Sequence, residues 1–464
     1  MGDIVSKSLK RGCKNMNPQQ IGSLSSLQPA LTRLDPLRLH GKVVAAAGLH
    51  LNLEGFAQWL QVGARLHLHP HGRTPIPAEI VGFQSGQARA LAFAPLEGIA
   101  PGVPAVLAPP ACLFVDESWL GRVIDPLGRP VDGKGPLRPG PLPRPVRAAP
   151  PEAGTRARLG PRLDLGVRAL DGFATCRRGQ RLGLFAASGV GKSTLLSMLA
   201  AGADCDVAVL ALVGERGREL REFLEDDLGP AGLARSVVVC ATSDSPPLMR
   251  REAALAAMAI AEHFADAGRQ VLLMMDSVTR FALALREIGL AAGEPPTTRG
   301  YTPSVFAELP RLLERAGPRE EGCAGAITGL FTVLVEGDDH DEPVADAVRG
   351  ILDGHVVLDR AIGERGRYPA IGILRSLSRT VPGCLRPEEG TLMRRARAIL
   401  ALHAEMADLV RLGAYRAGTD PAVDEAVRLA PRIEAVLAQG KGERDSIDGA
   451  FAALAAALEY ADGA

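Results

Sequence analysis

The sequence is poor in aromatic residues, which make up only 4% of its 464 positions. Because apolar residues still account for 47% of the chain, Leu, Val, Ile and Ala must fill its cores. The length is enough for two or three domains. No unbroken apolar run approaches the roughly 20 residues that a membrane-spanning helix needs, and no apolar stretch follows the basic N-terminal residues as in a secretory signal. These absences predict a soluble, cytoplasmic protein.

Paired cysteines and an excess of one charge are also missing. The seven cysteines are odd in number and none has C-x-x-C spacing, which argues against a disulfide framework or a zinc site and favours a reducing compartment. The 53 basic residues balance the 53 acidic ones, so the chain lacks the overall positive charge typical of nucleic-acid-binding proteins. We therefore expect no nucleic-acid partner.

The first third of the chain changes character twice. Residues 1–34 are polar, but they contain an apolar stripe at helical spacing, formed by Ile21, Leu24, Leu27, Leu31 and Leu34. This helix packs either on its own domain or on a partner protein, and the pattern does not decide between the two. Short β-rich runs separated by Gly and Pro follow in residues 35–112 and predict a small β-barrel. Residues 113–160 are rich in Pro, Gly and Arg, which indicates an extended connection.

In the rest of the chain, predicted strands alternate with helices up to about residue 385, and only helices follow. Five apolar strands with helices between them are expected at 181–186, 207–213, 237–241, 271–276 and 327–335. This α/β pattern predicts a mainly parallel sheet covered on both faces. After Pro387 the strands stop, and three helical segments predict a C-terminal helical domain. We therefore divide the chain into 1–34, a barrel at 35–112, a nucleotide-binding domain at 113–385, and helices at 386–464.

A phosphate-binding loop is predicted at 186–193, where Gly-Val-Gly-Lys-Ser lies between an apolar strand and a helix. Strand, loop and helix are the context that this motif requires, which argues against a chance Gly-Lys-Ser turn. Gly189 and Gly191 let the backbone N–H groups approach phosphate oxygens. Lys192 is placed to reach the β- and γ-phosphates, and the Ser193 hydroxyl to ligate Mg²⁺.

Two acidic residues follow apolar strands. Asp276 ends the 271–276 strand, and the carboxyl ends of parallel strands line the crevice in which such sheets bind ligands. It is therefore a candidate Mg²⁺ ligand, although an Asp here also suits a helix cap. Glu215, in the charged 214–219 segment, is a candidate for positioning the attacking water. An exposed, charged helix start would explain its composition equally well.

Several segments resemble the catalytic subunits of rotary ATP synthases, and more narrowly the type III secretion ATPases. They are residues 214–219, 275–281, 300–306, 334–339 and 351–355. The stretches 241–251 and 291–298 look most like flagellar protein-export ATPases. The resemblance runs from about residue 35 to the end of the chain. It implies a RecA-like P-loop NTPase core and Mg²⁺-dependent hydrolysis of ATP.

The resemblance also implies roles that spacing does not. Catalytic roles fall to Lys192, Glu215, Arg216 and Arg379. Nucleotide contacts fall to Ala186, Ala187, Ser188, Gly189, Val190, Gly191, Lys192, Ser193, Thr194, Arg280 and Tyr368. The metal-side residues are Ser193, Asp276 and Glu219. Tyr368 matches the residue that stacks on adenine, and Arg379 matches an arginine finger that reaches the site of the next subunit. Ala186, Ala187 and Gly372 depart from the usual pattern without removing a group that touches phosphate.

The implied assembly is a homohexamer at the inner face of the cytoplasmic membrane. There it releases chaperones and unfolds cargo at the flagellar export gate. A stator-like regulator binds the N-terminal segment, and a central stalk protein and export chaperones bind the C-terminal helices. Three alternatives remain: an ATPase of a virulence type III secretion system, a non-catalytic nucleotide-binding ring subunit, and a hexameric RNA translocase. Glu215 disfavours the second of these, and the balanced charge disfavours the third.

Overall fold

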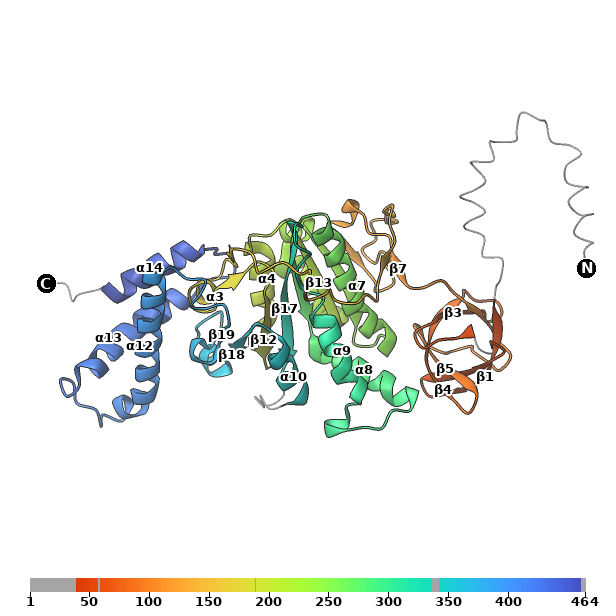
Figure 1. Ribbon diagram of the computed structural model, residues 1–464. Coiled ribbons are helices and arrows are strands. Elements are labelled where there is room, and N and C mark those ends of the chain that lie inside the picture. Colours follow the sequence, from red (N-terminus) through yellow and green to blue (C-terminus); the bar gives the residue numbers. More distant parts are fainter. Residues whose placement is uncertain (1–38, 57–58, 188, 336–341, 460–464) are drawn as a thin grey trace, which may run out of the picture.

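Three bodies follow one another along the molecule in the computed structural model, which describes residues 39–56, 59–187, 189–335 and 342–459. Figure 1 shows a small barrel at one end, an α/β body in the middle and a group of helices at the other end. This arrangement confirms the predicted fold class. The apolar stripe predicted between Ile21 and Leu34 lies outside the described residues.

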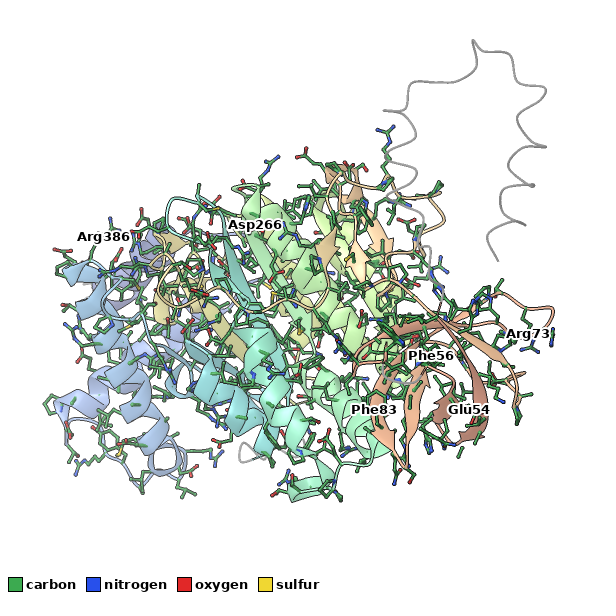
Figure 2. All side chains as sticks on the ribbon, turned by 45° about the vertical axis from the view of Figure 1, so that its right-hand side comes forward. Glu54, Phe56, Arg73, Phe83, Asp266 and Arg386 are labelled. Carbon is green, nitrogen blue, oxygen red and sulfur yellow. The ribbon has the colours of Figure 1, made fainter. Side chains whose placement is uncertain are left out.

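The barrel is closed by six antiparallel strands in the spatial order β1-β2-β5-β4-β3-β6. They are β1 (His40–Ala47), β2 (His50–Glu54), β3 (Arg65–Leu68), β4 (Ile76–Gln84), β5 (Gln87–Ala92) and β6 (Pro104–Leu107). Alternate side chains such as Leu51, Leu66 and Ile80 are fully buried inside it. Figure 2 shows Glu54, Phe56 and Phe83 on the barrel; Phe56 is buried, whereas Phe83 is exposed.

The central sheet is mainly parallel, with the strand order β19-β18-β12-β17-β15-β13-β14-β8. The strands are β8 (Arg122–Ile124), β12 (Arg181–Ala186), β13 (Val207–Glu215), β14 (Ser236–Thr242), β15 (Gln270–Asp276), β17 (Ala326–Leu334), β18 (Gly354–Leu358) and β19 (Leu377–Ser378). Only β19 and the short β16 (Gly317–Pro318) pair antiparallel. The five strands predicted from the sequence form the centre. Strand β8 comes from the 113–160 segment, which is therefore not only an extended connection.

Helices cover both faces of this sheet, so successive strand residues enter different cores. Leu210 packs into the core beneath α4 (Lys192–Gly202), and its neighbour Val209 packs into the core beneath α7 (Pro247–Asp266). The first face also carries α3 (Arg168–Phe173), α5 (Gly217–Glu222), the π-helix η4 (Phe223–Leu228) and α6 (Gly229–Ala234). The second carries α8 (Val278–Ala292), α9 (Pro303–Leu313) and α10 (Pro343–Ile351).

The C-terminal body consists of α12 (Pro387–Arg411), α13 (Pro421–Leu437) and α14 (Ile447–Glu459). These helices lie beside α3 and the β18–β19 end of the sheet (Figure 1). Two ion pairs hold the start of α12. Arg386 (labelled in Figure 2) bonds Asp448 of α14 at 2.5 Å, and Arg162 of β10 (Arg162–Leu163) bonds Glu389 of α12 at 2.8 Å. No helix among the described residues is both long and apolar enough to cross a membrane.

Short elements complete the described part of the chain within and between these bodies. They are β7 (Cys112–Leu113), η3 (Glu117–Trp119), β9 (Arg144–Pro145), β10 (Arg162–Leu163), β11 (Cys176–Arg177), η5 (Thr298–Gly300), α11 (Arg360–Glu364) and η7 (Ile373–Arg375).

Buried charges join the barrel to α7. The Arg251 guanidinium donates to both Glu79 oxygens, at 2.9 and 2.6 Å, and lies 3.2 Å from Glu252. Arg65 on β3 binds Glu252 and Glu79, and all four side chains are almost fully buried. Because buried ions need partners, this cluster specifies how the barrel sits on the sheet domain.

Candidate nucleotide-binding site

The predicted phosphate loop leaves strand β12 at Ala186 and enters helix α4 at Lys192. Gly189 and Gly191 have φ angles of 80° and 89°, a left-handed conformation that glycine adopts without a steric cost. A Cβ placed on Gly189 would touch nothing within 4 Å, so this side of the loop is open. Ala186 ends an extended strand, where alanine fits as well as glycine does. Ser188 lies outside the described residues.

Lys192 is the point where the loop meets the acidic residues. Its ammonium bonds Oδ1 of Asp276, and its Nζ lies 3.6 Å from Oε1 of Glu215. Asp276 ends β15, next to β17, and its Oδ1 also accepts a hydrogen bond of 2.8 Å from the Thr332 hydroxyl. The three groups predicted to act on the phosphates therefore converge from the ends of β12, β13 and β15, since parallel strands end at the same edge of a sheet.

The buried carboxylate of Glu215 has an oxygen that lacks a hydrogen-bond donor among the described residues. Burial raises the pKa of its carboxyl, and nearby Asp276 raises it further, whereas Lys192 and Arg280 oppose the shift. Its Oε1 lies 3.5 Å from Nε of Arg280, yet neither atom has a hydrogen-bond partner among the described residues. Arg280 is anchored on the carbonyl of Gly214. A buried acceptor without a donor suits a water molecule that must be polarised.

The other predicted residues differ in how closely they approach this centre. Val190 and Ala187 are buried beneath the loop, Thr194 is half-buried, and the Ser193 side chain is exposed. Arg216 and Glu219 lie 3.6 Å apart, with side chains that are 77% and 49% exposed. The structure thus brings Lys192, Glu215, Asp276 and Arg280 together, but it leaves Arg216 on the surface.

Tyr368 lies next to the phosphate loop although it is far away in sequence. A Cβ on Gly191 would lie 3.5 Å from Cε1 of the Tyr368 ring, which is half exposed, as a residue that stacks on a base must be. Buried Arg367 holds the flanking backbone by donating to the carbonyls of Pro369 and Ile371, at 2.9 and 2.8 Å.

Arg379 does not join the site of its own chain. Ser378 pairs with Gly354 at the start of β18, whereas Ala186 pairs with Leu358 at the end of that strand. This separates Arg379 from the phosphate loop by about 13 Å along the sheet. The Arg379 side chain is exposed and has no hydrogen bond or ion pair with the other described residues, whereas its backbone N–H donates to the carbonyl of Asp353 at 2.9 Å. An exposed arginine on the edge of the sheet is available to a neighbouring molecule.

Sequence reasoning missed the residues that support the site. Thr332 reads as an ordinary strand residue, and only the β15–β17 pairing brings it to Asp276. Arg367 and Gln439 donate hydrogen bonds to backbone carbonyl groups beside Tyr368, and such bonds leave no pattern in the sequence.

The residues present fit a magnesium ion that is bound together with phosphate. Among the described residues no three His, Cys, Asp or Glu side chains cluster as a metal site would need. Mg²⁺ is usually held by one or two protein oxygens, with phosphate and water completing its shell. The Ser193 hydroxyl and the Asp276 carboxylate match this donor set, and the unpartnered Oε1 of Glu215 lies 3.6 Å from the same Lys192 ammonium that bonds Asp276.

Comparisons with known proteins give the family. Residues 166–378 match the ATP synthase alpha/beta family, nucleotide-binding domain, and residues 385–456 match the T3SS EscN ATPase C-terminal domain. The chain is 55% identical over 441 residues to the flagellum-specific ATP synthase of Caulobacter vibrioides, covering 94% of this chain and 99% of that one. The chain belongs to the ATP synthase alpha/beta family. The resemblance read from the sequence is therefore confirmed.

Other members of this family match over nearly the same length. The type 3 secretion system ATPase of Xanthomonas euvesicatoria is 47% identical, over 89% of this chain and 92% of its own. Among solved structures, the assembled ATPase EscN from the enteropathogenic E. coli type III secretion system has a TM-score of 0.83. It is 38% identical, and the match covers 90% of this chain and 100% of EscN. EscN in complex with its central stalk EscO gives a TM-score of 0.81.

Proposed function

We propose that this chain is a Mg²⁺-dependent ATP hydrolase that works as a ring of six copies with its sites between neighbouring subunits. The convergence of Lys192, Glu215 and Asp276 beside an open glycine loop carries this proposal. Membership of the ATP synthase alpha/beta family and the likeness to an assembled ATPase support it.

In the proposed reaction each side chain has one task. Backbone N–H groups around Gly189 and Gly191 hold the phosphates, and Lys192 exchanges its carboxylate partners for phosphate oxygens. Ser193 and Asp276 would hold Mg²⁺, which would offset the negative charge of the bound triphosphate. Glu215 orients the lytic water, and Arg280 keeps that carboxylate in place. Arg379 of the neighbouring subunit stabilises the charge that builds on the γ-phosphate.

The hydrolase proposal is tested by the Glu215→Gln variant. The amide keeps the size of the side chain but cannot polarise water, so ATP binding should persist while turnover falls by about two to four decades. A Lys192→Ala control should lose binding as well as turnover. Measuring both nucleotide affinity and phosphate release separates the two effects. Wild-type turnover in the Glu215→Gln variant would refute the assignment.

The cellular role that we propose is flagellar protein export, in which hydrolysis releases chaperones and unfolds cargo at a gate in the cytoplasmic membrane. The 55% identical relative is named a flagellum-specific ATP synthase. The 47% identical type 3 secretion system ATPase favours a second candidate, export of virulence proteins. A central stalk at the C-terminal helices is proposed because EscN binds one.

Deleting the gene separates the two cellular roles. Loss of swimming and of filament-subunit export is the expected result, since these depend on the flagellar machine. Normal motility with lost effector secretion would move the assignment to the virulence branch.

A further inference from the structure

The helical domain holds the segment around Tyr368 at two points. On one side, the backbone N–H of Gln439, just beyond the end of α13, donates to the carbonyl of Tyr368 at 2.8 Å. On the other side, Glu434 of α13 accepts from Nε of Arg367 at 2.8 Å, while the same guanidinium holds the carbonyls of Pro369 and Ile371. The helical domain thus holds the carbonyl of Tyr368 directly, and through Glu434 it holds the Arg367 side chain, which in turn fixes the backbone just after the tyrosine.

The Gln439 side chain is itself held at every polar position. Its amide oxygen accepts from the Arg168 N–H at 2.9 Å, and its amide nitrogen donates to the carbonyls of Gly166 and Glu443, at 2.8 and 3.0 Å. Gln439 is 5% exposed, so these bonds form away from competing water. Because its amide oxygen and both amide hydrogens are bonded, the Gln439 side chain has a single orientation. This fixes the residue whose backbone N–H donates to the carbonyl of Tyr368.

This bonding pattern makes the position of the Tyr368 ring depend on the helical domain. The Tyr368 ring is half exposed, and its described neighbours include two glycines, Gly191 and Gly363, which have no side chains to hold it. Its direction is therefore set mainly by its backbone. We propose that Gln439 and Glu434 are positioning residues that hold the Tyr368 ring in place for stacking on the base of the nucleotide. This inference rests on the proposed nucleotide-binding function.

The proposal separates binding of the base from binding of the phosphates. Gln439 and Glu434 contact neither the phosphate loop nor the acidic residues in any described interaction, so their loss should affect only the part of ATP binding that comes from the base. Inorganic tripolyphosphate carries the phosphates without a base. A general loosening of the domain would weaken the binding of tripolyphosphate as much as that of ATP, whereas loss of the base contact would weaken only the binding of ATP.

We would measure the affinities of full-length wild type, Gln439→Ala and Glu434→Gln for Mg-ATP and for Mg-tripolyphosphate. Both variants should bind ATP less well, by about tenfold for Gln439→Ala, because aromatic stacking on a base is lost. Their tripolyphosphate affinity should equal that of wild type. Unchanged ATP affinity, or an equal loss for both probes, would overturn the proposal.

Two further comparisons keep the test decisive. Lys441→Ala is the matched control, because Lys441 lies in the same loop but bonds the carbonyl of Asp226 and the carboxylate of Asp227 instead. It should leave the ratio of the two affinities unchanged, and a shift like that of Gln439→Ala would refute a specific role. If Gln439→Ala shows no thermal unfolding transition, Glu434→Gln decides alone, since the Glu434 side chain is 44% exposed. Wild type that binds ATP no better than tripolyphosphate would contradict the base contact, whereas wild type that binds neither probe would contradict the proposed function.

Discussion

Among single residues, the Thr332 hydroxyl shows how the site depends on groups that never touch the nucleotide. It is fully buried on β17, and it donates to the Asp276 oxygen that also binds Lys192. The carboxylate that we propose as a Mg²⁺ ligand has to keep one orientation, and hydrogen bonds from neighbouring side chains provide it.

Replacing Thr332 by Val should therefore lower turnover by about tenfold with little loss of stability. The shape of the side chain is retained, and only the hydroxyl is lost, which lies 2.8 Å from Asp276 Oδ1 and 3.2 Å from the carbonyl of Met275. Steady-state hydrolysis and thermal unfolding would be measured together. Thr328→Val is the control, because Thr328 is buried on the same strand but accepts from the N–H of Gly179, away from the site. Turnover that is equal in both variants would count against the role of Thr332.

At the scale of elements, the junction between the barrel and α7 depends on buried charge. Arg251 bonds both oxygens of Glu79 and also pairs with Glu252, so its loss would leave two buried carboxylates with fewer partners. Removing one member of such a cluster costs about 3–5 kcal/mol.

The Arg251→Met variant should consequently lose about 3–5 kcal/mol of unfolding free energy, or release the barrel as a separate unfolding unit. Denaturant unfolding, together with limited proteolysis in the connection after β6, would detect either result. Arg147→Met is the matched control, since Arg147 also binds Glu79, at 2.7 Å, but is 47% exposed on its side chain. Its loss should cost at most about 1 kcal/mol. Similar losses in both variants would show that burial of the charge is not what matters.

The same junction should weaken in acid. Burial alone would raise the pKa of Glu79, but Arg251, with Arg147 and Arg65, holds it below its ordinary value of 4.5. Because the folded pKa is lower than the unfolded one, the stabilisation is complete above pH 4.5 and is lost as the pH falls through the folded value. The difference in unfolding free energy between wild type and Arg251→Met should therefore shrink on acidification. A difference that stays constant would contradict the ion-pair account.

Local patterns predicted the elements that carry the chemistry, and long-range pairing decided the rest. The apolar run before Gly189 and the run ending at Asp276 are visible as strands because both faces of a parallel sheet are buried. The role of β8 was not visible, since a strand of three residues within a Pro- and Gly-rich segment leaves almost no periodicity. Thr332 and Gln439 act through contacts between segments that are distant in sequence, which no local pattern encodes.

At the scale of the whole molecule, the proposed active site needs residues from more than one copy of the chain. Lys192, Glu215 and Asp276 lie at one edge of the sheet, whereas Arg379 lies exposed at its lateral end, beside the helical domain. A single chain cannot bring these groups together without unpairing β18 from β19. Hydrolysis should therefore depend on assembly, with each site shared by two subunits.

Mixing two inactive variants tests this claim most directly. Arg379→Ala keeps an intact loop and Glu215, while Glu215→Gln keeps an intact Arg379, so each variant alone should have little activity. In rings mixed at equal amounts, about one quarter of the interfaces would join an intact Glu215 to an intact Arg379. Phosphate release should then recover well above that of either variant alone. Full activity of Arg379→Ala alone, or mixed rings that stay as inactive as their components, would contradict a site shared between subunits.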